Sequence, residues 1–522
     1  MPTPNLLPGL PVLCLMVLAM PPAFCSTGAE ANVQTPGCEG IEARACLNRA
    51  IEAMGGQERL AAIKAVHLDV LGHTALVEQS YRQAPFITAY ERDQVVIDHA
   101  GQRYLSKQHG VWPEADLKGA DSDLTLLVTP AGAVYRVGER EVPGRPADLD
   151  AANQALALGP EAVLLTAAKA EDLKYLSAEN LRSTEHTVLG FTWKGIPVRV
   201  AINRFNHLPD AVETKQQFRD FWFYWGDVEQ RVYFDNWRLV EGITYPSNQI
   251  VERNGIEWSS SQAVDIDFNT PTDEKEFNAD AKTAAKSLQS PGWERGFRND
   301  QHRELAPGVD LFVGSWNTTI VKQPDGIVIL ETPISGTFTE GILAEARKRY
   351  PGLPVKAVLS TSDSWPHVGG VRYDVAEGLP VYILDLNRPL LDRMVDADHT
   401  INADSLQKSR KKPEWRIVTE QTEIGAGENR MVLYPLRGAT TERQYMVYFP
   451  ERRLLYASDT LALNADHSLY APELMHEVQQ AVEKAHLAVD TVYSMHEEPT
   501  PWSQVVTLLQ KSEQASQHPA GS

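Results

Sequence analysis

The stretch that decides the fold of the C-terminal half is STSDSWPHVGG, residues 360–370. It follows residues 355–359, a short run with β-branched side chains that predicts a buried strand. Pro351-Gly-Leu-Pro354 separates this strand from a helical segment before it. Residues 371–377 are predicted to form a helix. The stretch is therefore a loop at the carboxyl end of a strand, where α/β folds place ligands.

The loop resembles the T-H-x-H-x-D-H-x-G-G motif of the metallo-β-lactamase-fold hydrolases. Four residues match that motif: Thr361, His367, Gly369 and Gly370. Ser362 and Ser364 stand at the positions of the first two His ligands, and Pro366 stands at the position of the Asp. The resemblance implies that one of the family's two metal sites has lost its ligands.

The resemblance also implies a second, largely retained metal site. His367 corresponds to the last His of the motif, Asp459 to the bridging Asp, and His496 to the final His. Two imidazoles and one carboxylate suit a single Zn, Fe or Mn ion with open positions. Such an ion lowers the pKa of bound water to about 7. A metal-free relic of this site is an equal alternative.

Two further residues have predicted roles near this site. Asp363 lies in the loop and is a candidate fourth ligand or general base. Arg437 could neutralise an anionic substrate or replace a missing cation, because a guanidinium does not deprotonate in proteins.

Two other interpretations of these residues stay open. In a serine-type arrangement, Ser362 or Ser364 is the nucleophile, His367 the base and Asp459 its orienting partner. In a purely structural arrangement, His367 and His496 are core histidines that form hydrogen bonds with Asp459.

The composition bounds the class of protein. A chain of 522 residues is long enough for two or three domains. The formal net charge of −20 disfavours nucleic acid and anionic membranes as partners, because both require clustered Lys and Arg. Beyond the N-terminus, the sequence contains no run of about 18 apolar residues, so no transmembrane helix is expected.

The N-terminus predicts export to the periplasm or the medium. Leu6–Ala19 is mostly apolar and small residues follow it, so residues 1–29 resemble a secretory signal peptide. A lipid anchor at Cys25 is an alternative to simple cleavage. In an oxidising compartment, Cys38 and Cys46 are expected to form a disulfide.

The fold class predicted for the chain is α+β. An N-terminal antiparallel β-rich domain is predicted at residues 38–270, with helices in residues 46–62 and 146–177. The sequence pattern of this domain resembles exported lipoprotein-carrier proteins with curved, half-open sheets. A linker with a helical piece, residues 271–300, precedes a domain at residues 301–513 that resembles the αββα metallo-β-lactamase sandwich. In that domain we expect one strand at residues 417–425 and a last helix at residues 502–511. Residues 514–522 are predicted to be a disordered tail.

Two functions are compatible with this sequence. The first is a hydrolase that acts on an ester, amide or thioester of a small-molecule or envelope-derived substrate, which rests on analogy of fold. The second is a non-catalytic binding or scaffold protein whose β-rich domain holds an apolar ligand. Residues 218–225, FRDFWFYW, would then line an apolar concave face, although aromatic side chains also fill ordinary sheet cores. The oligomeric state is not predicted.

Overall fold

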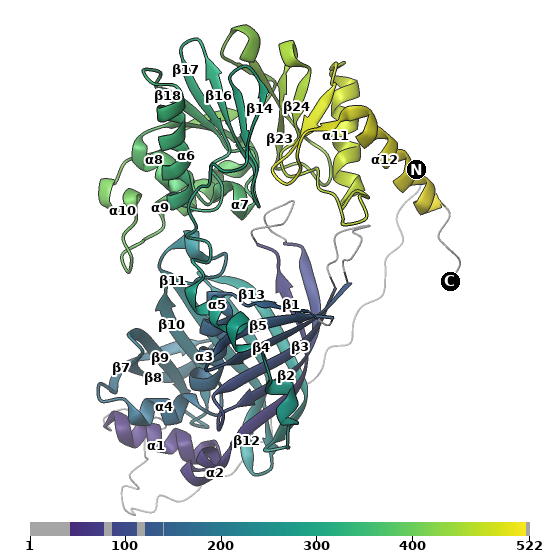
Figure 1. Ribbon diagram of the computed structural model, residues 1–522. Helices are drawn as coiled ribbons and strands as arrows, with labels where there is room; N and C mark the ends of the chain where they lie inside the picture. The colour runs from purple at the N-terminus through teal and green to yellow at the C-terminus, as the bar shows by residue number, and fades with distance from the viewer. Residues whose placement is uncertain (1–41, 78–85, 112–120, 139, 518–522) are drawn as a thin grey trace, which may run out of the picture. The chain divides into compact units, whose positions relative to one another are not determined.

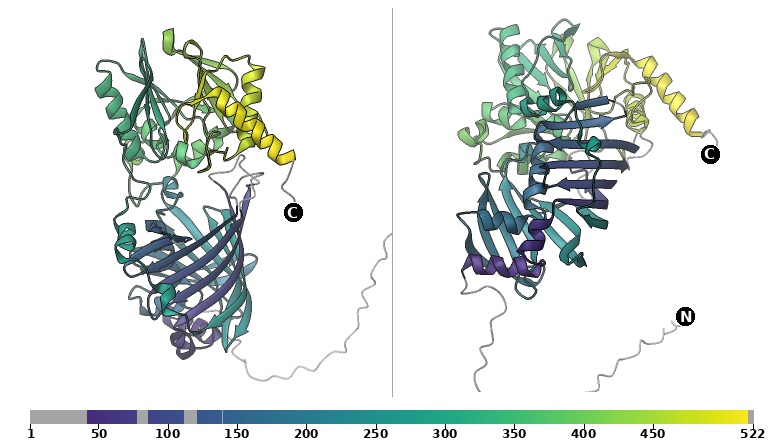
Figure 2. Two further views of the ribbon diagram at one scale, coloured as in Figure 1. Left: turned by 45° about the vertical axis from the view of Figure 1, so that its right-hand side comes forward. Right: turned by 60° about the horizontal axis from the view of Figure 1, so that its bottom comes forward.

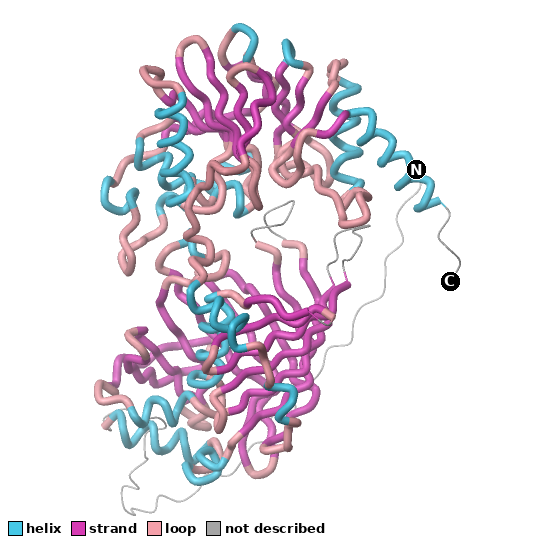
Figure 3. Tube along the Cα trace, viewed as in Figure 1, coloured by secondary structure: helices cyan, strands magenta, loops and turns pink. Residues whose placement is uncertain are grey.

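The computed structural model describes residues 42–77, 86–111, 121–138 and 140–517 (Figure 1). Figure 3 colours the helices cyan and the strands magenta. The strands form sheets of 13, seven and six strands. The expected mixture of helices and strands with a large antiparallel sheet is confirmed. The predicted signal peptide, with Cys25, and the predicted disulfide partner Cys38 lie outside the described residues. No helix in the described part of the chain has the length and apolar character needed to cross a membrane.

The 13-stranded sheet has the order β6-β5-β4-β3-β2-β1-β13-β12-β11-β10-β9-β8-β7. Its neighbouring strands are antiparallel, and Figure 2 shows that the sheet is strongly curved. Its strands are β1 (Ala65–Ala75), β2 (Thr88–Asp98), β3 (Arg103–Val111), β4 (Asp121–Thr129), β5 (Gly132–Val137), β6 (Arg140–Pro143), β7 (Lys174–Leu181), β8 (Thr184–Trp193), β9 (Ile196–Asn203), β10 (Pro209–Gln216), β11 (Val228–Val240), β12 (Ile243–Arg253) and β13 (Ile256–Phe268).

Four helices accompany this sheet. They are α1 (Ala43–Ala53), α2 (Gln57–Ala62), α3 (Pro146–Leu158) and α4 (Val163–Lys169). Three of them fall within the two predicted helical regions, and α1 begins at Ala43, before the predicted start at residue 46. Alternating apolar residues of β9, such as Val198 and Val200, form one buried core with Leu47 of α1 and Leu164 of α4. The period of two places these β9 side chains on one face of the sheet, where the helices cover them.

Part of the predicted linker packs against this sheet. Residues 281–289 form helix α5 (Ala281–Gln289), and its Ala284 is fully buried in a cluster with Leu127 and Val134. The Ser287 hydroxyl also accepts a hydrogen bond from the backbone N–H of Ala133 at 2.9 Å. The amphipathic spacing of α5 explains this packing, because one face is apolar.

The seven-stranded sheet has the order β14-β15-β16-β17-β18-β19-β20. Strands β14 to β17 are antiparallel to one another, and β17 to β20 run parallel. The strands are β14 (His302–Ala306), β15 (Val309–Phe312), β16 (Thr318–Gln323), β17 (Gly326–Leu330), β18 (Val355–Leu359), β19 (Pro380–Leu384) and β20 (Glu414–Val418). The helices of this region are α6 (Gly336–Arg349), α7 (Trp365–Val368), α8 (Val371–Glu377), α9 (Arg388–Asp396) and α10 (Ser405–Ser409).

The six-stranded sheet has the order β21-β22-β23-β24-β25-β26, in which only β24 and β25 form a parallel pair among the described strands. Its strands are β21 (Thr422–Ile424), β22 (Met431–Pro435), β23 (Tyr445–Phe449), β24 (Leu454–Tyr456), β25 (Thr491–Tyr493) and β26 (Thr500–Pro501), and its helices are α11 (Pro472–Lys484) and α12 (Trp502–Gln517).

These two sheets share a buried core. It contains Val321 and Leu359 from the seven-stranded sheet together with Met431 and Val447 from the six-stranded sheet. The other face of the seven-stranded sheet packs with α6, α8 and α9, and that of the six-stranded sheet packs with α11 and α12. Helices thus cover the outer faces of a pair of sheets.

Three expectations about individual elements need correction. The single strand predicted at residues 417–425 is divided between β20 and β21, which belong to different sheets. The polar residues 419–421 separate them, and the chain passes between the sheets there. The last helix, α12, continues from residue 511 to Gln517, so the first residues of the predicted tail are helical. The predicted open loop at residues 360–370 contains the short helix α7.

The aromatic stretch at residues 218–225 belongs mainly to a core. Trp222 is fully buried and Trp225 is nearly so, and both join a cluster with Met394 of α9 and Ile329 of β17. Phe218 differs, because it also lines a cavity in the N-terminal sheet. Core packing therefore explains the two tryptophans, whereas Phe218 also faces a ligand-sized space.

Candidate functional site

Strand β18 leads into a loop whose first residues are buried. Residues 360–363 are at most 3% exposed, and helix α7 follows them. Gly370 directly precedes helix α8. A Cβ atom on Gly370 would lie 1.9 Å from the Thr339 hydroxyl and 2.3 Å from the Thr332 carbonyl oxygen. A Cβ on Gly369 would lie 2.3 Å from the carbonyl oxygen of Ile334. The two glycines of the motif therefore allow the loop to pack against residues 332–334.

His367 lies fully buried on α7, between two carboxylates. Its Nδ1 is 3.1 Å from Oε2 of Glu331, and its Nε2 is 3.7 Å from Oδ1 of Asp459. Glu331 follows β17 and is buried, while Asp459 follows β24 and is 23% exposed. Both ring nitrogens of His367 thus face an acidic group.

Asp459 also contacts the second predicted histidine. Its Oδ1 is 2.6 Å from Nε2 of His496, whose side chain is 31% exposed. Gln444 orients the Asp459 backbone, because its Oε1 accepts a hydrogen bond from that N–H at 3.1 Å. The structure therefore brings together His367, Asp459 and His496, which are separated by up to 129 residues of sequence (496 minus 367).

Parallel strands explain this convergence. Strands β17 and β18 are parallel neighbours, and so are β24 and β25. The carboxyl ends of parallel neighbours lie at the same edge of a sheet. Glu331 and His367 follow the first pair, whereas Asp459 and His496 follow the second pair. The two facing sheets thus supply one half of the site each.

Glu331 is the site residue that sequence reasoning missed. It lies after β17 with a φ of 70°, and it is fully buried. The Thr361 backbone N–H donates to its Oε1 at 3.1 Å, the Thr361 hydroxyl also donates to it, and the Tyr456 hydroxyl donates at 3.3 Å. No local pattern in the sequence marks it, because its contacts depend on the parallel pairing of β17 with β18.

The electrostatics of the site favour an ion-paired His367. Burial disfavours the charged imidazole, but the carboxylates of Glu331 and Asp459 overcome this effect and raise the pKa of His367 to about 10. Burial likewise opposes the charge of Asp459, and the two histidines outweigh it, so the pKa of Asp459 lies well below its usual range. The two acidic neighbours therefore favour the protonated form of His367 over the neutral imidazole.

The predicted metal ligands do not form a metal site as they stand. Metal bonds of about 2.0–2.1 Å with tetrahedral geometry place two ligand atoms roughly 3.3 Å apart. The 3.7 Å separation of His367 and Asp459 is close to that value, but His496 and Asp459 are in direct hydrogen-bond contact at 2.6 Å. Within the described ranges, no group of three or more His, Cys, Asp or Glu side chains is arranged to hold a metal ion.

Asp363 and Arg437 form ion pairs with other partners. Oδ2 of Asp363 accepts a hydrogen bond from Nε of Arg443 at 2.6 Å, and both side chains are largely buried. This pair competes with the predicted roles of Asp363 as base or ligand. Arg437 donates to Oδ1 of Asp385 at 2.9 Å, so the arginine paired with the motif loop is Arg443.

The two serines of the loop do not complete a serine-type arrangement. The Ser362 hydroxyl accepts a hydrogen bond from the Ser364 backbone N–H at 3.1 Å. A serine nucleophile requires a histidine nitrogen as its base. Both nitrogens of His367 face carboxylates instead, so this arrangement has no support in the geometry.

Comparison with known proteins gives structural likeness alone. The chain matches no protein-family model and has no significant match among curated proteins. Solved structures that are similar to part of it include DIM-1 metallo-β-lactamase, with 14% identity over 42% of this chain and 99% of that chain and a TM-score of 0.33. A metallo-β-lactamase from Erythrobacter litoralis is 18% identical, and the match covers 42% of this chain and 99% of that chain with a TM-score of 0.32. Both belong to the class of protein that residues 360–370 resemble.

A third similar structure is the inverting sec-alkylsulfatase Pisa1 from Pseudomonas sp., with 14% identity and a TM-score of 0.31. The match covers 42% of this chain and 41% of that chain. The matched part of this protein spans about two fifths of the alkylsulfatase's length. The chemistry considered below rests on the distances within this molecule.

Proposed function

We propose that the protein is a hydrolase-like enzyme that acts on a small-molecule ester, with His496 as general base and Asp459 as its orienting partner. The observation that carries this proposal is the 2.6 Å contact between Nε2 of His496 and Oδ1 of Asp459. A carboxylate in that position favours the tautomer with a proton on Nε2 and leaves Nδ1 to accept a proton.

The surroundings of Asp459 support this role. Its depressed pKa keeps the carboxylate ionised over the range in which an imidazole works as a base. Its Oδ1 faces both the buried His367 and the partly exposed His496. His496 is thus the member of the set that a water molecule and a substrate can reach. We derive no step through a metal ion, because the donor atoms do not fit one.

Export forms a second part of this proposal. It is supported by the apolar segment Leu6–Ala19 and the small residues after it. Fractionation of cells that express the full chain tests it: the protein should appear in the periplasm or the medium, and retention in the cytoplasm would refute export without affecting the chemistry.

Hydrolysis of a panel of p-nitrophenyl esters by the full chain tests the chemistry. A positioned general base contributes about 10²–10⁴ in rate, so His496→Gln should lower kcat/KM by about that factor. Asp459→Asn should also lower it, because an amide can present its N–H to Nε2 and reverse the tautomer.

His486→Gln is the matched control, since His486 is an exposed histidine after α11. It should leave kcat/KM unchanged. Absence of turnover by the unmodified chain, or equal turnover by His496→Gln, would refute the proposal. Thermal unfolding of each variant separates loss of the base from loss of the fold.

A further inference from the structure

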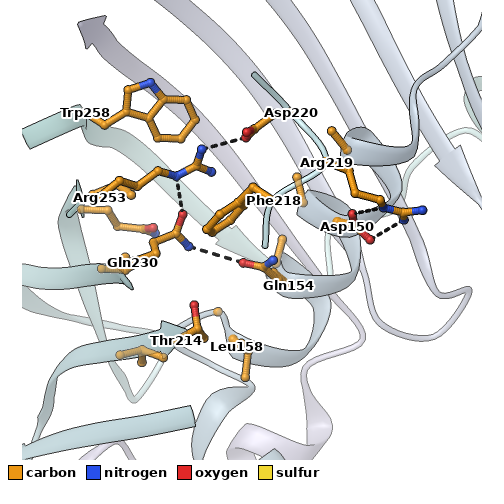
Figure 4. Close-up of a pocket in the computed structure, with 18 of the residues that line it drawn as sticks. Asp150, Gln154, Leu158, Thr214, Phe218, Arg219, Asp220, Gln230, Arg253 and Trp258 are labelled. Atoms are coloured by element: carbon orange, nitrogen blue, oxygen red, sulfur yellow. Dashed lines mark hydrogen bonds and ion pairs between the residues drawn. The ribbon is translucent and has the colours of Figure 1, made fainter. Parts of the chain in front are cut away.

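A cavity of about 270 Å³ lies between helix α3 and strands β10 to β13 of the N-terminal sheet, and it shares no residue with the site at Asp459. Figure 4 shows it in close-up. Residues at every second position of two adjacent strands line one wall: Gln230, Val232 and Phe234 on β11, and Gln249, Val251 and Arg253 on β12. Alternation places these side chains on one face of the sheet, beneath α3.

One end of the cavity is formed by a buried guanidinium. Arg253 lies 3.8 Å from the ring centroids of both Phe218 and Trp258. Its Nη1 is 2.7 Å from Oδ2 of Asp220, and its Nε donates to Oε1 of Gln230 at 2.9 Å (Figure 4). The aromatic contacts and the ion pair hold this end in one conformation.

The charges that line the cavity are balanced. Arg253 has Asp220 as its carboxylate, and Arg219 donates to both oxygens of Asp150 at 2.6 Å. A charged ligand would therefore find its possible counter-ions in this lining already paired with each other, and burial of an unpaired charge is costly. The lining favours an uncharged ligand.

A row of glutamine amides lies beside Arg253. Gln230 donates to Gln154 at 3.4 Å, and Gln154 donates to Gln216 at 3.4 Å. Hydrogen bonds of this length are at the weak end of the range. Both bonds of Gln154 are of this length, so its amide can turn toward a ligand with little loss, and it can both donate and accept.

Next to this polar end, the lining is mostly apolar, since the Val232–Val251 pair follows the Gln230–Arg253 pair along β11 and β12. This apolar part includes Leu158 of α3 with Val212, Val232 and Val251 of the sheet. A cavity of 150 Å³ accommodates benzene, so a cavity of this size holds roughly ten non-hydrogen atoms.

From these features we infer that the cavity binds one small, uncharged amphipathic molecule. Its apolar body lies along Leu158 and the valines, and its single head, a hydroxyl or a primary amide, forms hydrogen bonds with Gln154 and its neighbours. The inference does not depend on the hydrolase proposal, because the two sites share no residue.

Isothermal titration of the full chain with three nine-carbon probes tests the inference. The probes are 1-nonanol, nonanoate at pH 8 and protonated nonylamine. The structure assigns one binding site to 1-nonanol, and it predicts at least about tenfold weaker binding of both ions, since burial of an unpaired charge costs several kcal/mol.

Two variants locate the site. Gln154→Leu removes one amide and should weaken binding of 1-nonanol by about tenfold, the effect of one lost hydrogen bond. Val251→Phe should abolish binding, because the larger side chain fills the apolar part. If Val251→Phe does not fold, as judged by thermal unfolding, Gln154→Leu decides the test.

Gln262→Leu and Val264→Phe are the matched controls, because both residues are exposed on β13 and neither lines the cavity. They should bind 1-nonanol as the unmodified chain does. Absence of binding by the unmodified chain, equal affinity for the charged probes, or unchanged affinity of Gln154→Leu would each overturn the inference.

Discussion

At the scale of single residues, the contact between Glu331 and His367 has a direct consequence for stability. Both side chains are fully buried, and no solvent reaches their contact. Glu331→Gln leaves the imidazolium with one carboxylate partner in place of two. Breaking a buried pair costs about 3–5 kcal/mol, so we expect a decrease of that order in the free energy of unfolding, measured by urea denaturation.

Glu257→Gln is the control for this prediction, because Glu257 is exposed on β13. Surface substitutions change the free energy of unfolding by about 0.5 kcal/mol or less. If Glu331→Gln has an effect as small as that, the pair is not an ionic contact.

The two motif glycines give a second prediction at this scale. Gly370→Ala places a Cβ atom against the carbonyl oxygen of Thr332, which cannot move without the backbone. Overpacking of this kind costs about 1–3 kcal/mol or more, and the melting temperature should fall accordingly. Gly110→Ala is the matched control, because its Cβ would meet only the Ser122 hydroxyl at 3.6 Å. Equal melting temperatures of the two variants would contradict the explanation.

The sequence predicted some residues of the site and missed others. The motif loop led to His367, and the family pattern led to Asp459 and His496, which the structure brings together. Glu331 was missed because its contact depends on the parallel register of β17 and β18, which no local pattern encodes. The partner of Asp363 was missed for a similar reason, since Arg443 lies 80 residues away.

At the scale of elements, strand β2 contains a carboxyl group that makes stability depend on pH. Burial raises the pKa of Asp93 to about 7, and the carboxylate of Glu91 adds to this effect. The unfolded chain has an Asp pKa of about 3.9. Between these values the folded state binds more protons, so stability falls as pH rises from about 4 to 7.

Asp93→Asn removes this dependence. Near pH 4 the variant and the unmodified chain should be equally stable. By pH 8 the variant should be more stable by about 1–3 kcal/mol. This is less than the free energy that corresponds to the whole pKa shift, because the side chain is only partly buried and solvent screens it. Urea denaturation at several pH values measures this difference. A constant difference across pH would show that Asp93 does not titrate in this way.

Elements were predictable where periodicity is strong and turns are marked. The Gly55-Gly56 break between α1 and α2 has φ values of 122° and 95°, which favour glycine. The division of residues 417–425 into β20 and β21 was not predictable, because each piece is too short to show alternation of its own. Helix α7 has four residues, which is below the length that a helical period reveals.

At the scale of the whole molecule, the aromatic cluster around Trp222 joins residues that are distant in sequence. Trp222 contacts the rings of Trp225 and Trp258 and shares its cluster with Met394. Trp222→Ala should lower the free energy of unfolding by about 3–5 kcal/mol. Calorimetry should show one transition for the unmodified chain and two for the variant, because the cluster includes residues of both halves of the sequence.

Leu239→Ala is the control for this prediction, since Leu239 is 75% exposed. Two separate transitions in the unmodified chain would refute the idea that the cluster couples the two regions. The sequence identified these aromatic residues but not their partners, because Met394 and Ile329 come from segments more than 100 residues away.

The measurement that tests the central claim most directly is ester hydrolysis by the full chain before and after prolonged dialysis against a chelator. Because Nε2 of His496 contacts Asp459 at 2.6 Å with no space for an ion between them, kcat/KM should be the same in both samples and should be lost in His496→Gln. Loss of turnover after dialysis, with recovery on addition of Zn²⁺ or Mn²⁺, would contradict the account.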